Sequence, residues 1–210
     1  MDFLIASHNM KKREELQRIL APLGVSVYFD FECGVILNEV IEDGATFAEN
    51  ALKKARSACA DSMMPVIADD SGLCIDALGG RPGVFSARFM GEDTPYPEKI
   101  AALLEELKDV PDEQRTARFV CNIAVVFPTG QHFIAEGKVE GKIGYEMRGN
   151  NGFGYDPIFY VGDRSFAEFS AEEKDAVSHR GNAIRKAAEM LKEYIWTDTG
   201  DGSLYQRSVY

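Results

Sequence analysis

Short apolar segments alternate with amphipathic helical patterns along almost the whole chain, and this alternation restricts the fold more than any other feature. Residues 3–6 are four apolar residues typical of a buried strand, and polar residues follow at 7–9. A helix is expected from about Met10, with Asn9 as its N-cap. Strands and helices that interleave in this way predict an α/β fold with a mixed central sheet flanked by helices.

The remaining elements follow from the same two periodicities. Two capping boxes, Thr46-x-x-Glu49 and Ser170-x-x-Glu173, mark helix starts, and the first of these helices is expected to end near Ser62. Further helices are expected at 97–107 and 182–195, strands at 25–29, 65–68, 73–78, 118–127 and 158–161, and a hairpin over 132–143.

Length and charge limit the function classes. The 210 residues suit one domain over residues 1–195, followed by a loosely ordered tail over residues 196–210. The net charge of −11 makes the chain a poor candidate for binding a nucleic-acid backbone. The longest apolar runs have five residues, so no membrane span is expected. Four cysteines without metal-site spacing suit reduced thiols in the cytoplasm: Cys33, Cys59, Cys74 and Cys121.

The first candidate site is the predicted turn from strand to helix. Free N–H groups at the start of a helix, with a hydroxyl and an amide beside them, can bind an anion such as phosphate. Lys12 and Glu15 lie three residues apart on one face of this helix, where a cation can contact phosphate and a carboxylate can hold a metal ion. The spacing alone also fits a surface ion pair. The substrate-binding residues predicted here are Ser7, His8, Asn9, Met10, Lys11 and Lys12.

The second candidate site is Asp69-Asp70-Ser71-Gly72, directly after the apolar strand at 65–68. Ligands of open α/β sheets bind beyond the carboxyl ends of strands, and adjacent acids there are costly unless a metal ion or a reaction uses them. Because successive strand residues point to opposite faces, only one of the two acids can enter a given site, and Asp70 is expected to be that one. Taken alone, the motif fits a solvated turn equally well.

A magnesium site is predicted from the acidic residues near this motif. Mg²⁺ binds through a few carboxylates together with water and substrate phosphates. Glu42, just before the second helix, adds a carboxylate, and Lys54 on that helix can face the same space. The predicted metal ligands are therefore Glu42, Asp70 and Glu15.

Two later segments carry features of a nucleotide site. Phe153 stands between two glycines, where its ring can stack on a purine, worth about 1–3 kcal/mol for a nucleic-acid base. A core phenylalanine in a tight turn is the alternative. Lys174, His179 and Arg180 form a polar cluster, and Arg180, which only donates hydrogen bonds, favours a base with a carbonyl edge.

Five segments in a fixed order carry a resemblance that spans residues 3–192. They read SHNMKKREE at 7–15, EDGATFAENALKKAR at 42–56, IADDSGLCIDALGGRPGVFSARF at 67–89, NNGFGYDPIF at 150–159 and EEKDAVSHRG at 172–181. Together they resemble the Ham1/inosine triphosphate pyrophosphatase family.

The resemblance implies an elongated, two-lobed, Mg²⁺-dependent homodimer with the active site in the cleft between the lobes. It implies hydrolysis of deaminated purine nucleotides (ITP, dITP and XTP) to the monophosphate and pyrophosphate. Asp70 would be both metal ligand and general base, with Asp69 and Lys12 completing the catalytic set. The nucleotide site would be lined by Lys54, Ser71, Phe153, Gly154, Tyr155, Asp156, Lys174, His179 and Arg180.

Three other functions compete with this one. A related pyrophosphatase can act on other nucleotides, such as modified pyrimidines, and only the base pocket separates it from a purine enzyme. A nucleotide sensor can retain the phosphate site without hydrolysis, but a pure binder does not need a water-activating acid, and the chain keeps the carboxylates of Glu15, Glu42, Asp69 and Asp70. A flavodoxin-like redox domain is disfavoured because no glycine-rich dinucleotide fingerprint follows the first strand.

Overall fold

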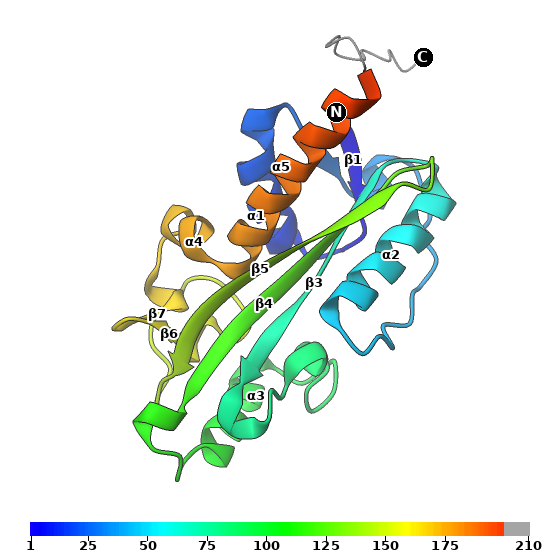
Figure 1. The fold of residues 1–210 in the computed structure, drawn as a ribbon. Coiled ribbons are helices and arrows are strands. Elements are labelled where there is room, and N and C mark those ends of the chain that lie inside the picture. Colours follow the sequence, from blue (N-terminus) through cyan, green and yellow to red (C-terminus); the bar gives the residue numbers. More distant parts are fainter. Residues whose placement is uncertain (200–210) are drawn as a thin grey trace.

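A seven-stranded mixed sheet forms the centre of the protein (Figure 1). The computed structural model describes residues 1–199 and the side chains of residues 1–194. The strand order is β2-β1-β3-β4-β5-β6-β7; β1 pairs in parallel with β2 and β3, and the other neighbours are antiparallel. The predicted fold class is confirmed. The strands are β1 (Asp2–Ile5), β2 (Ser26–Tyr28), β3 (Val66–Ile75), β4 (Thr116–Val126), β5 (His132–Ile143), β6 (Phe159–Val161) and β7 (Arg164–Ser165).

Helices cover both faces of this sheet. Figure 1 shows α1 and α5 on one face, α2 on the other, and α3 at the far end of the long strands β3, β4 and β5. Asn9 caps α1 as predicted, and its side chain accepts hydrogen bonds from the backbone N–H groups of Lys11 and Lys12. The α-helices of the described chain are α1 (Met10–Leu20), α2 (Phe47–Ser62), α3 (Tyr96–Glu106), α4 (Ala171–Val177) and α5 (His179–Thr199).

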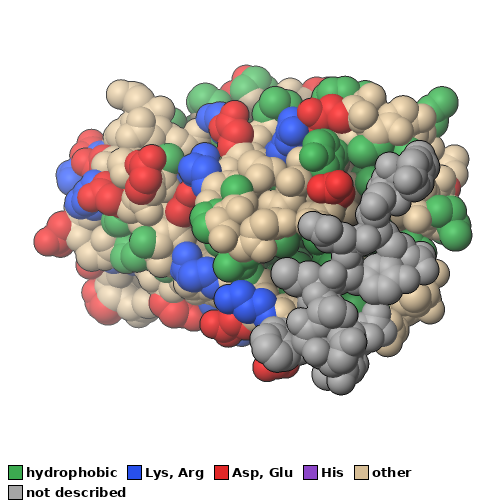
Figure 2. Space-filling model, turned by 90° about the horizontal axis from the view of Figure 1, so that it is seen from above, with side chains coloured by type: hydrophobic (Ala, Val, Ile, Leu, Met, Phe, Trp, Pro, Cys, Tyr) green, Lys and Arg blue, Asp and Glu red, His purple; other side chains and the backbone are tan. Residues whose placement is uncertain are grey.

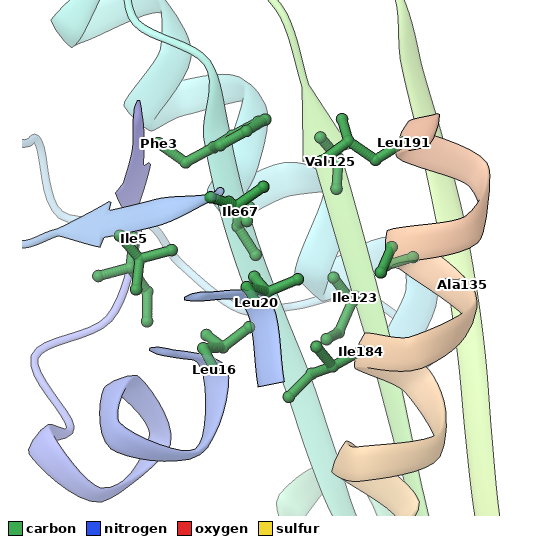
Figure 3. Packing of buried hydrophobic residues seen from close by; sticks show 14 of the residues in the cluster. Phe3, Ile5, Leu16, Leu20, Ile67, Ile123, Val125, Ala135, Ile184 and Leu191 are labelled. Atoms are coloured by element: carbon green, nitrogen blue, oxygen red, sulfur yellow. The ribbon is translucent and has the colours of Figure 1, made fainter. Parts of the chain in front are cut away.

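Alternation of side chains along the strands divides the core between the faces. On one face Ile67 and Ile123 pack against Leu16 of α1 and Ile184 of α5 (Figure 3). On the other face, Ala68 belongs to a cluster that includes the small apolar residues of α2. A third cluster lies at the far end of the long strands, where Leu73 and Ile75 pack with Ile100, Leu103 and Leu107.

Strand β3 is longer than predicted. It does not end at Ala68 but runs through Asp69 and Asp70, paired with β4 along its whole length. Its other neighbour, β1, ends at Ile5, which lies opposite Ile67. From Ala68 onward β3 therefore lacks β1 at its side. The expected crevice lies beyond the end of β1, and this is why two acids can lie inside a continuous strand.

Three further details differ from the prediction. The segment expected as a hairpin is the single strand β5, which pairs with β4 to form the hairpin. α5 begins at His179 and continues to Thr199, so 196–199 are helical, while the predicted tail at 200–210 lies outside the described residues. Thr46 caps α2 as expected, but the Glu49 side chain accepts from the N–H of Ala45 rather than completing the capping box.

The surface carries charges of both signs, and the free thiols agree with the sequence prediction. On the face seen in Figure 2, acidic and basic side chains are interspersed. None of the helices within residues 1–199 is both long and apolar enough to cross a membrane. All four cysteines are free thiols, and Cys59 and Cys121 are buried.

Candidate active site

A cavity of about 200 Å³ lies beside β3, where β1 has ended and α1 begins. Segments far apart in the sequence meet there: the start of α1, the loop before α2, β3, the loop after β5 and the start of α5. The cavity is lined by Asn9, Lys12, Glu42, Lys54, Asp70, Ser71, Gly72, Ser86, Ala87, Tyr96, Phe119, Phe153, Gly154, Tyr155, Asp156, Lys174, His179 and Arg180.

Most residues of the predicted substrate and metal sets line this cavity, and several of the exceptions have partners elsewhere. His8 is exposed and lies 3.1 Å from Asp30. Lys11 donates a hydrogen bond to the carbonyl of Gly152 on the opposite wall. The predicted residues that do not line the cavity are Ser7, His8, Met10, Lys11, Glu15 and Asp69.

One end of the cavity holds two carboxylates with a lysine between them. Lys54 Nζ lies 3.2 Å from Glu42 Oε1 and 3.8 Å from Asp70 Oδ1. Behind them Asn50 Nδ2 donates a 3.0 Å hydrogen bond to Asp70 Oδ2. Burial raises the pKa of Asp70, while Lys54 and the Asn50 bond oppose that shift. This acidic end therefore offers a ligand two carboxylates, which are hard oxygen donors, and the ammonium group of Lys54.

Asp69 lies on the opposite side of β3 and belongs to a different set of contacts. Its Oδ2 lies 3.0 Å from Lys12 Nζ and 3.3 Å from Arg180 Nε. Burial by itself raises the pKa of Asp69, but the charges of Lys12 and Arg180 outweigh burial and hold that pKa well below its ordinary value. Asp69 is therefore ionised, and it stabilises the two cations rather than entering the cavity.

Glu15 extends the same buried network. Its Oε2 lies 2.6 Å from Arg180 Nη1, and its Oε1 lies 3.7 Å from Lys174 Nζ. Lys174 also forms a 2.6 Å ion pair with Asp156, whose Oδ2 accepts from the N–H of Phe153. Glu15, predicted as a metal ligand, thus has cations at both of its oxygens. Three donors of Arg180 are also engaged, by Glu15, Asp69 and Ser71.

Aromatic side chains also line the cavity, and the part formed by Phe153 and Tyr155 is called the aromatic end below. Phe153 has Lys174 Nζ 4.8 Å and the Arg180 guanidinium carbon 5.5 Å from its ring centroid. Tyr155 is buried and donates to the carbonyl of Ser86. Both residues line the cavity, so Phe153 is not an ordinary core residue.

His179, at the first position of α5, stacks on Phe119 with ring centroids 4.7 Å apart. Burial, followed by the nearby charges of Arg180 and Lys174, lowers the pKa of His179 well below its ordinary value. Among the described side chains, its Nδ1 and Asp69 Oδ1 are the buried polar atoms without a hydrogen-bond partner. The cavity lining therefore includes a neutral imidazole whose Nδ1 has no hydrogen-bond partner.

The start of α1 differs from the predicted anion site. Asn9 Oδ1 accepts from the N–H groups of Lys11 and Lys12, so the N-cap has already engaged these two amides. Lys12 and Asn9 nevertheless line the cavity. The charge of Lys12, rather than the helix amides, is what this element contributes.

Five lining residues were not predicted as site residues: Gly72, Ser86, Ala87, Tyr96 and Phe119. Gly72, Ser86 and Ala87 lie in the segment at 67–89 that carries the family resemblance. That resemblance was the signal by which they could have been predicted as site residues. Tyr96 and Phe119 lie on a helix and a strand with ordinary apolar patterns. No local pattern distinguishes them from core residues.

The donor set at the acidic end suits a hard divalent ion only in part. Glu42 and Asp70 are the nearby carboxylates, and among residues 1–194 no group of three or more His, Cys, Asp or Glu side chains is arranged to hold a metal ion. Mg²⁺ commonly binds through one or two carboxylates and completes its shell with water and substrate phosphates. Glu42 and Asp70 fit that mode of binding.

Comparison with known proteins gives consistent matches over most of the chain. The model of the Ham1 family matches residues 3–190. A protein of Desulforamulus reducens named dITP/XTP pyrophosphatase is 47% identical over 193 residues, which are 91% of this chain and 96% of that protein. A Bacillus subtilis protein of the same name is 47% identical over 191 residues, 90% of this chain and 96% of its own.

Solved structures match as well. A HAM1 protein from Coxiella burnetii superposes with a TM-score of 0.83 and 42% identity, covering 92% of this chain and 99% of that chain. A nucleoside-triphosphatase, also named dITP/XTP pyrophosphatase, from Mycobacterium abscessus superposes with a TM-score of 0.72 and 45% identity, covering 91% and 99%.

Proposed function

The chain belongs to the Ham1 family, and from this we propose that it hydrolyses deaminated purine nucleoside triphosphates (ITP, dITP and XTP) to the monophosphate and pyrophosphate. The observation that supports this most directly is a single cavity lined by both charged and aromatic side chains. Its carboxylates and lysines suit a triphosphate with its counter-ion, and its aromatic rings suit a stacked base.

We assign the chemical step to Asp70. Its carboxylate accepts a proton from the water whose oxygen attacks the α-phosphorus. The bond from that phosphorus to the oxygen bridging to the β-phosphate breaks, and pyrophosphate leaves. Lys12, at the start of α1, stabilises the departing charge. Asp69 supports this step indirectly because it holds Lys12 at 3.0 Å.

Glu42 and Asp70 are the residues that we propose to hold Mg²⁺. When bound, Mg²⁺ neutralises charge on the triphosphate and polarises the phosphorus. Lys54 lies close to both carboxylates and can exchange these contacts for a phosphate oxygen. We propose no ligand role for Glu15, because Arg180 and Lys174 already lie against its two oxygens.

The base is assigned to the aromatic end. Phe153 provides a stacking surface, and the neutral His179, which also lines the cavity, has an unpaired nitrogen. A site that hydrogen-bonds one base edge rejects a base with the opposite edge, because the polar groups of the site are then left unpaired. We assign to His179 the tautomer with the proton on Nδ1, which donates to a carbonyl at position six and is left unpaired against the amino group of adenine.

A substrate panel tests the proposal. The protein is incubated with Mg²⁺ and ITP, XTP, ATP, GTP, dTTP or UTP, and pyrophosphate and orthophosphate are measured separately. We expect ITP and XTP turnover with release of pyrophosphate. Release of orthophosphate, or equal turnover of ATP, would contradict the proposal, and preferred turnover of dTTP or UTP would favour the pyrimidine alternative.

The Asp70→Asn variant separates catalysis from binding. It keeps the size of the side chain but removes the proton acceptor, so ITP turnover should be lost while nucleotide binding and the thermal transition persist. A variant that still turns over ITP would overturn the assignment of the base. A wild-type protein that binds ITP without hydrolysis would instead be a sensor.

We also propose that the chain acts as a homodimer in the cytoplasm and that residues 1–195 form one two-lobed unit. The separate apolar clusters at the two ends of the long strands support the two-lobed description. Light scattering distinguishes a species of 23.3 kDa from one of twice that mass.

A further inference from the structure

Asn50 is fully buried on α2 and does not line the cavity, yet it contacts both sides of the acidic end. Its Nδ2 donates to Asp70 Oδ2 at 3.0 Å, and its Oδ1 accepts from the N–H of Gly44 at 2.8 Å. Gly44 lies two residues after Glu42. A single side-chain amide therefore connects the loop that carries one carboxylate to the strand that carries the other.

The orientation of this amide is determined by its partners. A backbone N–H only donates, so the oxygen of Asn50 must face Gly44 and its NH₂ group must face Asp70. An aspartate at this position has no proton to donate to an ionised Asp70. Of the polar side chains close in size to asparagine, only the amide makes both bonds.

The approach of the loop to α2 is close as well as hydrogen-bonded. A Cβ atom on Gly44 would lie 2.6 Å from Asn50 Oδ1 and 2.9 Å from Glu49 Cβ. Glu49 also accepts from the N–H of Ala45 at 2.7 Å. A glycine at position 44 thus lets the loop sit against the first turn of α2, where Asn50 reaches it.

Lys54 is the other residue that contacts Glu42 and Asp70, and it lies one helical turn after Asn50 on the same face. Lys54 lines the cavity and is available to an incoming phosphate, whereas Asn50 is buried behind the carboxylates. The connection that Asn50 makes between the Glu42 loop and Asp70 therefore persists when Lys54 exchanges a carboxylate for a phosphate.

We infer that Asn50 is a positioning residue of the active site, which fixes Glu42 and Asp70 relative to each other through its bonds to Gly44 and Asp70. The inference rests on the proposed hydrolysis at these carboxylates. Substitution of residues that orient metal ligands or catalytic groups commonly costs about 10–100-fold in activity or metal affinity.

Two variants separate the two bonds. Asn50→Ala removes both, whereas Asn50→Asp keeps the acceptor for Gly44 but loses the donor to Asp70. We expect kcat for ITP to fall about 10-fold or more in both variants, with little change in KM because Asn50 does not line the cavity. Hydrogen–deuterium exchange of the peptide covering residues 40–47 should become faster in Asn50→Ala and stay slow in Asn50→Asp.

Asn38→Asp is the matched control. The Asn38 amide also donates to a carboxylate on α2, Asp61 Oδ1 at 2.7 Å, but this pair is exposed and outside the cavity. Its kcat and the exchange at 40–47 should equal those of the wild type.

Three results would overturn the inference: wild-type kcat in Asn50→Asp, a change confined to KM, or a loss of kcat that matches only the loss of folded protein. Failure of Asn50→Asp to fold would also overturn it, because Asn50 would then be a packing residue. The exchange measurement needs no substrate. A wild-type protein that does not hydrolyse ITP would contradict the proposed function, while the exchange data would still test the link to Gly44.

Discussion

Asp69 and Asp70 are neighbours in the chain, but their carboxylates lie in different surroundings because alternate residues of β3 face opposite sides. Asp70 faces α2 and the cavity, whereas Asp69 faces α1 and α5, where Lys12 and Arg180 surround it. The prediction that only one of the two would enter the cavity is confirmed by the lining residues.

Replacing Asp69 by asparagine should destabilise the fold. The side chain is fully buried, and its loss of charge leaves Lys12 and Arg180 under-compensated, which for buried ion pairs costs about 3 kcal/mol. Urea unfolding measures this. The control is Asp76→Asn, which removes an exposed pair with Arg118 and should cost less than about 1 kcal/mol. Equal losses in the two variants would contradict the structural role of Asp69.

His179 should make folding stability depend on pH. Its pKa in the folded protein is lowered by burial and by Arg180, Lys174 and Lys12, against an opposing effect of Asp69. Below about pH 6.5 the unfolded chain therefore binds a proton that the folded protein does not, and stability falls as pH falls. We expect a loss of about 1 kcal/mol from this group between pH 7.5 and 5.5.

Urea unfolding of His179→Phe and His132→Asn checks that prediction. His179→Phe retains a ring against Phe119 and should reduce the dependence on pH over this interval. His132 is exposed, and its substitution should leave the dependence as in the wild type. A dependence that His179→Phe leaves unchanged would show that another group titrates.

At the scale of elements, the position of α5 depends on β5. A Cβ atom on Gly137 would lie 2.1 Å from the carbonyl oxygen of His179 and 2.3 Å from the backbone nitrogen of Ala183. These are backbone atoms of a helix and cannot move alone. The close packing of β5 against α5 therefore places His179 and Arg180 at the cavity.

Gly137→Ala should displace α5. Overpacking of this kind costs about 2 kcal/mol, and it should also raise KM for ITP because residues at the aromatic end move with the helix. Glu140→Ala on the same strand removes only an exposed contact with Arg118 and serves as the control for both measurements. Wild-type stability and KM in Gly137→Ala would mean that the helix accommodates the methyl group without shifting.

At the scale of the whole molecule, the net charge of −11 repels the proposed substrate, which is itself a polyanion. The half-buried Lys12 and the buried Lys174 and Arg180 are largely balanced by their own carboxylate partners. A divalent ion is thus the natural source of the remaining positive charge.

Removal of divalent ions with EDTA should abolish ITP turnover, and added Mg²⁺ should restore it. Glu42→Gln should raise the Mg²⁺ concentration needed for half-maximal turnover, because one carboxylate of the proposed pair is lost. Glu140→Gln, an equal change of charge outside the cavity, should leave that concentration unchanged. Full turnover in EDTA would exclude the proposed metal dependence.

The sequence alone was sufficient to predict the helix starts, the fold class and part of the site. Asn9 was identifiable as an N-cap, and Thr46 as the start of α2, because a helix terminus is satisfied by residues a few positions away. The alternation of apolar segments likewise predicted the mixed α/β sheet. The residues around Asp70 and Phe153 were found because glycine and acidic residues break the apolar pattern.

What the tertiary structure decided depends on contacts between distant segments. The continuation of β3 through its acids follows from pairing with β4, and the crevice beside it follows from the early end of β1. Glu15 forms an ion pair with Arg180 and does not line the cavity. Tyr96 and Phe119 line the cavity, although they lie in segments with ordinary apolar patterns. A sequence specifies each residue's local preferences, but which residues become neighbours is a property of how the whole chain packs.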